Sequence, residues 1–120
     1  MARILIIEDN QDNMVLANML LQSEGHEVFC AEEAILGIEI AKREIPDMIL
    51  MDVQLPNMDG ITACRILKEN PATVGIKIIA LTAFAMIGDK EKILAKGMDG
   101  YISKPFFRKE FLSKVRNYLL

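Results

Sequence analysis

Short runs of apolar residues alternate along the chain with longer stretches in which apolar positions recur every three or four residues. A short unbroken apolar run is typical of a strand buried on both faces, whereas the longer spacing marks one face of a helix. The runs predict five strands, at residues 3–7, 27–30, 47–51, 76–81 and 100–103. The periodic stretches predict five helices, at residues 11–23, 33–43, 60–69, 88–96 and 108–120.

The predicted helices carry end signals and inward faces. Gly25 and Gly97 stand where glycine commonly ends a helix, and Pro46 stops the second helix because proline cannot continue the hydrogen-bond ladder. In the second helix we expect Ile35 and Ile38 to face the core. The last helix has an apolar stripe formed by Phe111, Leu112, Val115 and Leu119.

Repeated strand–helix units predict an α/β domain in which a parallel sheet has helices on both faces and right-handed crossovers. The chain of 120 residues is the size of one ordinary domain and too short for two good cores. The sequence shows no linker, repeat or low-complexity segment. We therefore expect residues 1–120 to form a single domain.

Composition narrows the possible functions. With 52% hydrophobic and 26% charged residues the chain should fold, and a net charge of -3 weighs against a nucleic-acid groove. No apolar run approaches the roughly 20 residues needed to span a bilayer, and the first residues lack the pattern of a secretory signal. Cys30 and Cys64 have no metal-type spacing, and His26 is the single histidine. We expect reduced thiols, a cytoplasmic location and no membrane insertion.

Polar and charged residues follow four of the five predicted strands at their carboxyl ends. They are Glu8 and Asp9 after the first strand, Asp52 after the third, Thr82 after the fourth and Lys104 after the fifth. In open α/β sheets, ligands bind beyond this edge. The convergence marks this edge as the candidate functional site.

Three carboxylates brought together at one edge repel one another. Two unit charges about 4 Å apart cost on the order of 4 kcal/mol at an effective dielectric near 20. Lys104 offers one compensating charge, and a hard divalent cation such as Mg²⁺, which prefers carboxylate oxygens, offers two more. The acidic cluster therefore predicts a metal, and the metal predicts a phosphate. A plainer interpretation makes Asp9 and Asp12 helix N-caps and Lys-Pro a turn, but it does not explain the joint appearance at four strand ends.

Four segments match a known pattern: Ile-Glu-Asp-Asn (7–10), Leu-Met-Asp-Val-Gln-Leu-Pro-Asn-Met-Asp-Gly (50–60), Ala-Leu-Thr-Ala (80–83) and Tyr-Ile-Ser-Lys-Pro (101–105). On these segments the chain resembles the receiver domains of bacterial two-component response regulators, of the stand-alone, single-domain type. Each motif is weak alone, but together they are specific, and the resemblance covers essentially the entire chain. It implies a flavodoxin-like doubly wound (βα)5 fold with strand order 2-1-3-4-5.

The resemblance also implies a role for each residue at the strand ends. Asp52 would be the phosphoacceptor, forming an aspartyl phosphate with a phosphoryl group from a histidine kinase or phosphotransfer protein. Asp9 and Asp52 would ligate Mg²⁺ directly, Glu8 through a water, and Gln54 through its main-chain carbonyl. Lys104 and the metal would neutralise charge on the phosphoryl oxygens. Glu8 replaces the Asp that is commoner in the family.

Further positions match the family's switch and framework. The Thr82 hydroxyl would bond the phosphoryl oxygen, and the Tyr101 ring would fill the vacated space; their plainer interpretations are a strand-end threonine and a surface aromatic. The bond before Pro105 is implied to be cis. Gly60 begins the third helix and is expected to allow close backbone approach or a positive φ, unless it is only a turn glycine after Asp59.

The resemblance implies an output through a change of surface, across the fourth helix, fifth strand and fifth helix. The apolar loop 83–87 and the pair Phe106-Phe107 are candidate contacts for a kinase or another downstream signalling protein. The family pattern also makes Gln54 and Phe84 control access of water to the phosphate, and bulky Phe84 cannot orient a water. We expect a long-lived phosphorylated state in a monomer or a weak phosphorylation-dependent dimer, with cell-cycle or differentiation control by analogy.

Three other functions compete with this interpretation. An aspartate-nucleophile phosphatase would need a second Asp as general acid two residues after the nucleophile, where this chain has Gln54. A flavin carrier of the same fold class would need a hydroxyl- and glycine-rich phosphate loop where residues 8–12 are acidic. An inactive receiver could serve as a scaffold, although all the required side chains are present.

Overall fold

The computed structural model describes residues 1–83 and 87–120, with only the main chain of residues 87–90. Strands and helices alternate throughout these residues. The strands are β1 (Arg3–Ile7), β2 (Glu27–Ala31), β3 (Met48–Asp52), β4 (Lys77–Thr82) and β5 (Gly100–Ser103). The helices are α1 (Gln11–Ser23), α2 (Ala34–Glu44), α3 (Gly60–Glu69), α4 (Ile87–Ala95) and α5 (Arg108–Leu119).

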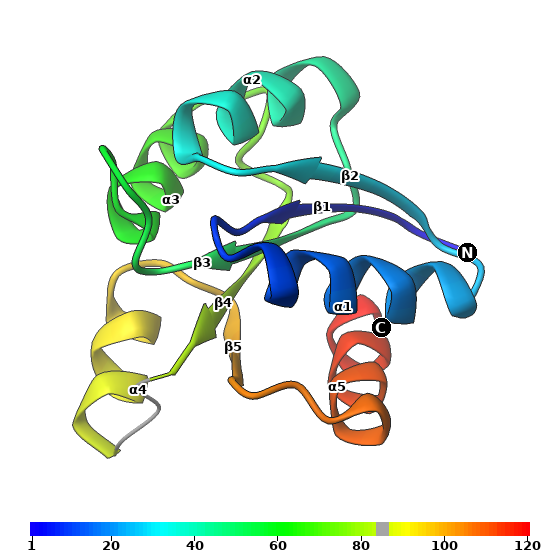
Figure 1. The fold of residues 1–120 in the computed structure, drawn as a ribbon. Coiled ribbons are helices and arrows are strands. Elements are labelled where there is room, and N and C mark those ends of the chain that lie inside the picture. The colour runs from blue at the N-terminus through cyan, green and yellow to red at the C-terminus, as the bar shows by residue number, and fades with distance from the viewer. Residues whose placement is uncertain (84–86) are drawn as a thin grey trace.

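The strands form one parallel five-stranded sheet in the order β2-β1-β3-β4-β5. Helices α1 and α5 cover one face of the sheet, and α2 and α3 cover the other (Figure 1). The order reverses between β1 and β3, so the carboxyl ends of these neighbouring strands flank the crevice in which such sheets bind ligands. The expected flavodoxin-like fold is confirmed.

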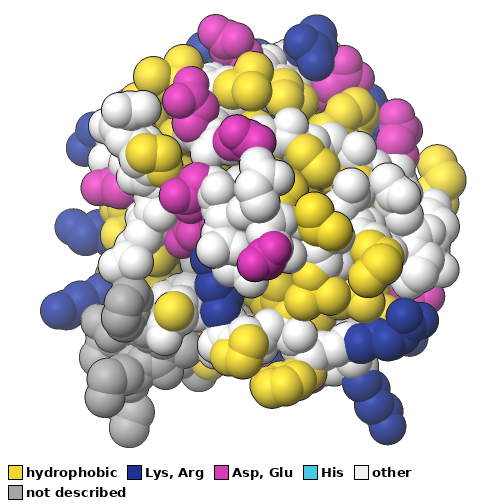
Figure 2. Space-filling model, viewed as in Figure 1, with side chains coloured by type: hydrophobic (Ala, Val, Ile, Leu, Met, Phe, Trp, Pro, Cys, Tyr) yellow, Lys and Arg dark blue, Asp and Glu magenta, His cyan; other side chains and the backbone are white. Residues whose placement is uncertain are grey.

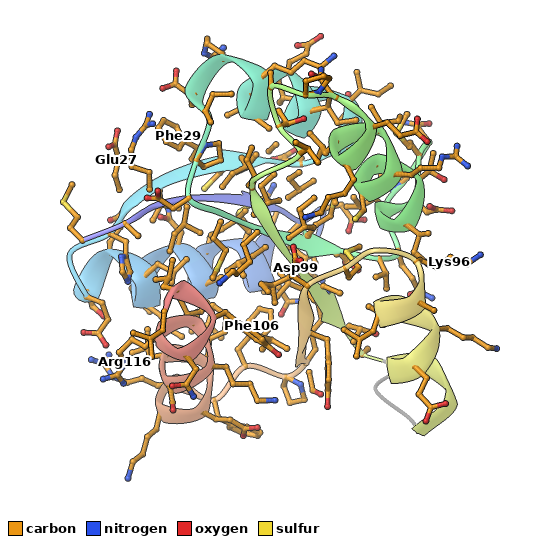
Figure 3. All side chains as sticks on the ribbon, turned by 180° about the vertical axis from the view of Figure 1, so that it is seen from behind. Glu27, Phe29, Lys96, Asp99, Phe106 and Arg116 are labelled. Atoms are coloured by element: carbon orange, nitrogen blue, oxygen red, sulfur yellow. The ribbon has the colours of Figure 1, made fainter. Side chains whose placement is uncertain are left out.

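The core divides into two layers because successive side chains of a strand point to opposite faces. Ile4 and Ile6 of β1 pack towards α1 and α5, whereas Leu5 and Ile7 pack towards α2 and α3. Every residue of β3 is buried. Side chains fill the space on both sides of the sheet (Figure 3), which explains why the central strands read as unbroken apolar runs.

The observed elements agree with the predicted ones to within one residue at every end. The inward face of α2 was predicted wrongly at one position, because Ile35 is 49% exposed while Ile38 is buried. Helix α2 approaches the sheet closely through small residues. A Cβ atom added at Gly37 would lie only 2.6 Å from Cγ1 of Ile7, and this close contact turns Ile35 to the outside.

The ends of α1 show how local sequence sets a boundary. Gly25 has a φ of 82° and donates its N–H to the Gln22 carbonyl at 3.0 Å, as in a Schellman motif. At the other end the N-cap is Asn10, whose side chain accepts a hydrogen bond from the Asn13 N–H at 2.9 Å. The plainer interpretation of Asp9 and Asp12 as caps of this helix is therefore wrong.

The two phenylalanines after Pro105 differ in exposure. Phe107 is 64% exposed, but Phe106 is buried against Phe111, with ring centroids 5.0 Å apart. The segment is thus part-exposed, as expected, through Phe107 alone. The choice of Phe106 as a docking contact is wrong, because its ring completes the core beneath α5. The candidate contacts Phe84 and Met86 lie outside the described residues, as does the side chain of Ile87. No described helix is both long and apolar enough to span a bilayer.

Candidate functional site

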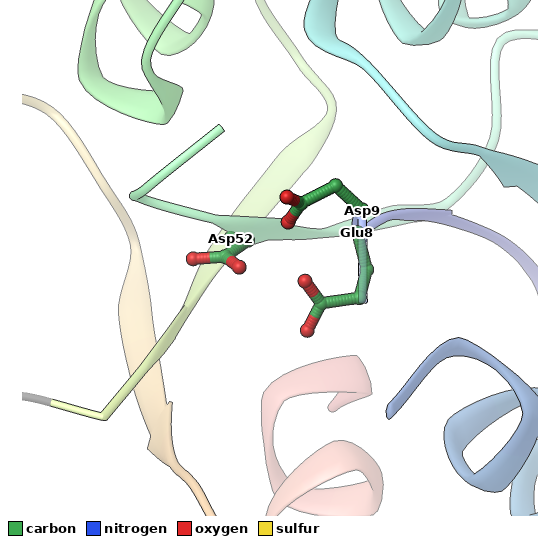
Figure 4. Close-up of side chains that lie close together, drawn as sticks. All are labelled: Glu8, Asp9 and Asp52. Carbon is green, nitrogen blue, oxygen red and sulfur yellow. The ribbon is translucent and has the colours of Figure 1, made fainter. Parts of the chain in front are cut away.

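Three carboxylates meet at the carboxyl edge of the sheet. Glu8 and Asp9 directly follow β1, and Asp52 is the last residue of the neighbouring strand β3. One oxygen from each lies within 4.8 Å of the other two, and the three groups converge (Figure 4). Glu8 and Asp52 are buried, whereas Asp9 is exposed. The cluster therefore has a protected floor and an open side.

Lys104 supplies the positive charge beside these carboxylates. Its Nζ lies 2.6 Å from Oε1 of Glu8 and 2.8 Å from Oδ2 of Asp52. The lysine main chain is fixed by a 2.8 Å hydrogen bond from its N–H to the Thr82 carbonyl, and the bond to Pro105 is cis, as expected. In the space-filling view, acidic side chains gather on this face with basic atoms among them (Figure 2).

Burial and neighbouring charges together shift the pKa values of Glu8 and Lys104. Burial, followed by the neighbouring Asp52 carboxylate, raises the pKa of Glu8 to about 7, although Lys104 opposes the change. Burial alone would lower the pKa of Lys104, but its ion pairs with Asp52 and Glu8 outweigh burial and raise it. Near neutral pH, Lys104 therefore keeps its charge while Glu8 takes up a proton readily.

The main chain after β3 is arranged around Asp52. The Gln54 N–H donates to Oδ1 of Asp52 at 2.9 Å, and the Gly60 N–H donates to the Val53 carbonyl at 3.1 Å. A Cβ atom added at Gly60 would lie 2.9 Å from Cα of Val53, and the glycine does not have a positive φ. Of the reasons considered for Gly60, the structure supports close backbone approach.

Thr82 and Tyr101 lie on the strands beyond Asp52. Thr82 ends β4 and is buried, and it pairs in register with Ser103 of β5. Tyr101 is half-buried against the α2/α3 layer of the core, and the Lys114 ammonium lies 5.3 Å from its ring centroid. This lysine could not be identified from the sequence, because α5 is separated from β5 by a loop.

The residues at this edge suit a hard cation. All three acidic groups offer oxygen ligands, which Mg²⁺ prefers, and a histidine or thiolate is not part of the cluster. Among the described residues, Oε1 of Glu8 has no aligned hydrogen bond even though it is buried beside Lys104. Asp9 is not used as a helix cap, so its carboxylate remains available. The donor set therefore fits the expected Mg²⁺.

Solved structures share the whole fold. The receiver domain of a sensor histidine kinase from Pseudomonas aeruginosa, which has a magnesium ion coordinated in its active-site cleft, is 36% identical with a TM-score of 0.89, over 98% of this chain and 97% of that one. The chemotaxis response regulator CheY4 of Vibrio cholerae is 24% identical with a TM-score of 0.93, covering 98% of each chain. At 24% identity, the similarity to CheY4 supports only the fold.

Sequence comparison gives the family. The model of the response regulator receiver domain matches residues 4–116. The polar-differentiation response regulator DivK of Brucella ovis is 38% identical over 116 residues, which make up 97% of this chain and 94% of that protein. These matches favour the receiver interpretation over the phosphatase and flavin-carrier interpretations, since the family model extends over residues 4–116. The chain therefore belongs to the response regulator receiver family of the two-component systems.

Proposed function

We propose that this chain is a Mg²⁺-dependent phosphoacceptor in a phosphorelay, with Asp52 as the residue that is phosphorylated. The observation that carries the proposal is the convergence of Glu8, Asp9 and Asp52 within 4.8 Å beside the Lys104 ammonium. The donor would be the phosphohistidine of a histidine kinase or phosphotransfer protein. The chain would assist its own phosphorylation and dephosphorylation without being a conventional enzyme.

In the proposed transfer, one carboxylate oxygen of Asp52 attacks the phosphorus atom. The phosphorus–nitrogen bond to the donor imidazole breaks, and the imidazole nitrogen takes up a proton from solvent. The Gln54 N–H, 2.9 Å from Oδ1, orients the carboxylate. Lys104 moves from the carboxylate to the phosphoryl oxygens as charge shifts onto them. In dephosphorylation, water attacks the phosphorus and the Asp52 carboxylate is released with inorganic phosphate.

Glu8, Asp9, Asp52 and the main-chain carbonyl of Gln54 are the groups proposed to hold the metal, Glu8 through a water. When bound, Mg²⁺ supplies two positive charges that offset the acidic cluster and the phosphoryl oxygens. The protein's own contribution is to keep Asp52 buried and oriented, so that little reorganisation is needed at the moment of transfer.

The proposed switch passes from Thr82 to Tyr101. The buried Thr82 hydroxyl would bond a phosphoryl oxygen, and the Tyr101 ring would follow it inwards, changing the surface of α4, β5 and α5. This surface is the proposed contact for a downstream signalling protein. The exposed Phe107 replaces the buried Phe106 as the residue of choice for testing it. We propose a monomer or a weak dimer formed on phosphorylation.

We place this phosphorelay in the cytoplasm, which suits the two free cysteines, Cys30 and Cys64. The similarity to DivK, which is named a polar-differentiation response regulator, supports a role in cell-cycle or differentiation control. Phosphoryl loss is proposed to be slow because of Phe84, which lies outside the described residues.

The test is the intact mass of the protein after incubation with Mg²⁺ and acetyl phosphate. The wild type should gain one phosphoryl group, and Asp52→Asn should gain none. Asp12→Asn removes a nearby exposed carboxylate that is not in the cluster and should behave as the wild type. Omitting Mg²⁺ should abolish the gain. An unmodified wild type under all these conditions would contradict the proposal and favour a scaffold that acts without phosphorylation.

A further inference from the structure

The carboxyl-terminal turn of α5 holds the free edge of β5. Strand β5 is the last in the sheet, and an edge strand leaves one row of main-chain groups without a neighbouring strand. The Tyr101 N–H and C=O both meet the hydroxyl of Tyr118, at 3.3 Å each. One phenol thus accepts from the amide and donates to the carbonyl of the same residue, as α5 lies beside β5 (Figure 1).

Two further contacts show that Tyr118 is built into this position. A Cβ atom added at Gly100 would lie 2.6 Å from the Tyr118 hydroxyl oxygen and closer still to its ring, so only glycine leaves room for the phenol. The Tyr118 carbonyl accepts a hydrogen bond from Nζ of Lys77, the first residue of β4. The tyrosine is therefore tied to β4 through its main chain and to β5 through its side chain.

The same face of α5 also contacts the Tyr101 ring. Lys114 lies one helical turn before Tyr118, so the two side chains emerge on one face of the helix. The Lys114 ammonium sits 5.3 Å from the centre of the Tyr101 ring, within cation–π range. Helix α5 thus holds Tyr101 at two points, its main chain through Tyr118 and its ring through Lys114.

We propose that Tyr118 is a positioning residue for the switch: its hydroxyl holds the Tyr101 main chain in the conformation of the unphosphorylated chain and so opposes switching. This inference rests on the proposed function, in which the Tyr101 ring moves inwards when Asp52 is phosphorylated, and adds that the main chain carrying the ring shifts with it. A bond that is made in one state and weakened in the other shifts the balance between the two states. Loss of the hydroxyl should therefore favour the phosphorylated conformation.

The test is a titration with beryllofluoride, a phosphoryl mimic, in the presence of Mg²⁺. Tyr118→Phe keeps the ring over Gly100 and removes only the hydroxyl. We expect it to lower the thermal midpoint slightly and to lower the beryllofluoride concentration at half-saturation about three- to tenfold. The Tyr101 amide should also exchange its hydrogen faster in Tyr118→Phe without the mimic.

Arg116→Met is the matched control, because it also removes polar contacts of α5. Arg116 forms an ion pair with Glu24 and donates a hydrogen bond to the Leu112 carbonyl. Among the contacts of the described residues, neither involves Tyr101. Arg116→Met should change the thermal midpoint but leave half-saturation at the wild-type value.

The result for Tyr118→Phe decides between a switch role and a structural one. A lower thermal midpoint with unchanged half-saturation would mean that Tyr118 only stabilises the fold. A higher half-saturation value would mean that it supports the phosphorylated state, and either result overturns the inference. A wild type that neither binds beryllofluoride nor gains a phosphoryl group would overturn the proposed function, and the inference with it.

Discussion

The imidazole of His26 accepts a hydrogen bond through Nδ1 from the main-chain N–H of Ala2, at 3.0 Å. Burial, followed by the positive charge of the amino terminus, lowers the pKa of His26 below its ordinary value of about 6.5. The folded chain thus binds fewer protons than the unfolded chain when the pH falls below that value. The stability contributed by neutral His26 is complete above about pH 6.5 and is lost as the pH falls towards the folded pKa.

His26→Asn tests this dependence, since the Asn side-chain oxygen can accept the same hydrogen bond but does not titrate. The free energy of unfolding, from urea denaturation, should fall more steeply in the wild type than in the variant between about pH 7 and pH 5. Carboxylates titrate in both proteins, so their contribution cancels in the difference. Parallel curves would show that His26 does not carry the effect.

The difference in burial between Phe106 and Phe107 can be tested with single substitutions. Phe106→Ala removes a buried ring that packs against Phe111, and we expect it to cost about 3–5 kcal/mol of unfolding free energy. Phe107→Ala should cost less than about 1 kcal/mol, because the ring is 64% exposed. Urea denaturation of the two variants measures both values. Similar losses in both would contradict the assignment of Phe106 to the core.

At the scale of elements, the close packing of α2 against β1 depends on the absence of a side chain at Gly37. Gly37→Ala would drive a methyl group into the Ile7 side chain, and we expect it to cost about 1–3 kcal/mol. Gly75→Ala is the control, because no described atom lies within 4 Å of an added Cβ there. That change should be neutral or stabilise by up to about 1 kcal/mol. Equal thermal midpoints for the two variants would show that α2 can shift without cost.

The elements themselves could be predicted from sequence because their signals are local. The apolar run of β3 and the Gly25 cap of α1 depend only on neighbouring residues. The failures at Ile35 and Phe106 have a different cause, since which side of a helix or loop is buried depends on partners far along the chain. Ile35 is exposed because α2 packs on Ile7 through Gly37 on its other side, and Phe106 is buried because its ring packs against Phe111.

The candidate site likewise has a part that local sequence predicts and a part that depends on residues far along the chain. Strand-end position alone placed Glu8, Asp9 and Asp52 together, because parallel strands bring their carboxyl ends to one edge. The hydrogen bonds between the Tyr118 hydroxyl and the Tyr101 main chain could not be predicted in this way. It depends on the angle at which α5 returns to the sheet and on a glycine in β5 that makes room for the ring.

For the whole molecule, the proposed Mg²⁺ site at the acidic cluster should couple stability to metal binding. A ligand that binds only the folded state stabilises it by RT ln(1 + [L]/Kd), about 2.7 kcal/mol when its concentration is 100 times Kd. The thermal midpoint of the wild type should therefore rise with Mg²⁺ concentration, by several degrees for a chain of 120 residues.

Asp9→Asn separates two effects of the acidic cluster on stability, which are repulsion between its carboxylates and stabilisation by bound Mg²⁺. Without Mg²⁺ the variant should be more stable than the wild type, because it removes one of three mutually repelling carboxylates while keeping the side-chain size. With Mg²⁺ its midpoint should rise little, because a proposed direct ligand has lost its charge, so the order of the two proteins should reverse. Asp12→Asn, which alters an exposed carboxylate outside the cluster, should respond to Mg²⁺ as the wild type does. If Asp9→Asn gained as much from Mg²⁺ as the wild type, the metal would be binding elsewhere, and the acidic cluster would not be the site that links stability to the metal.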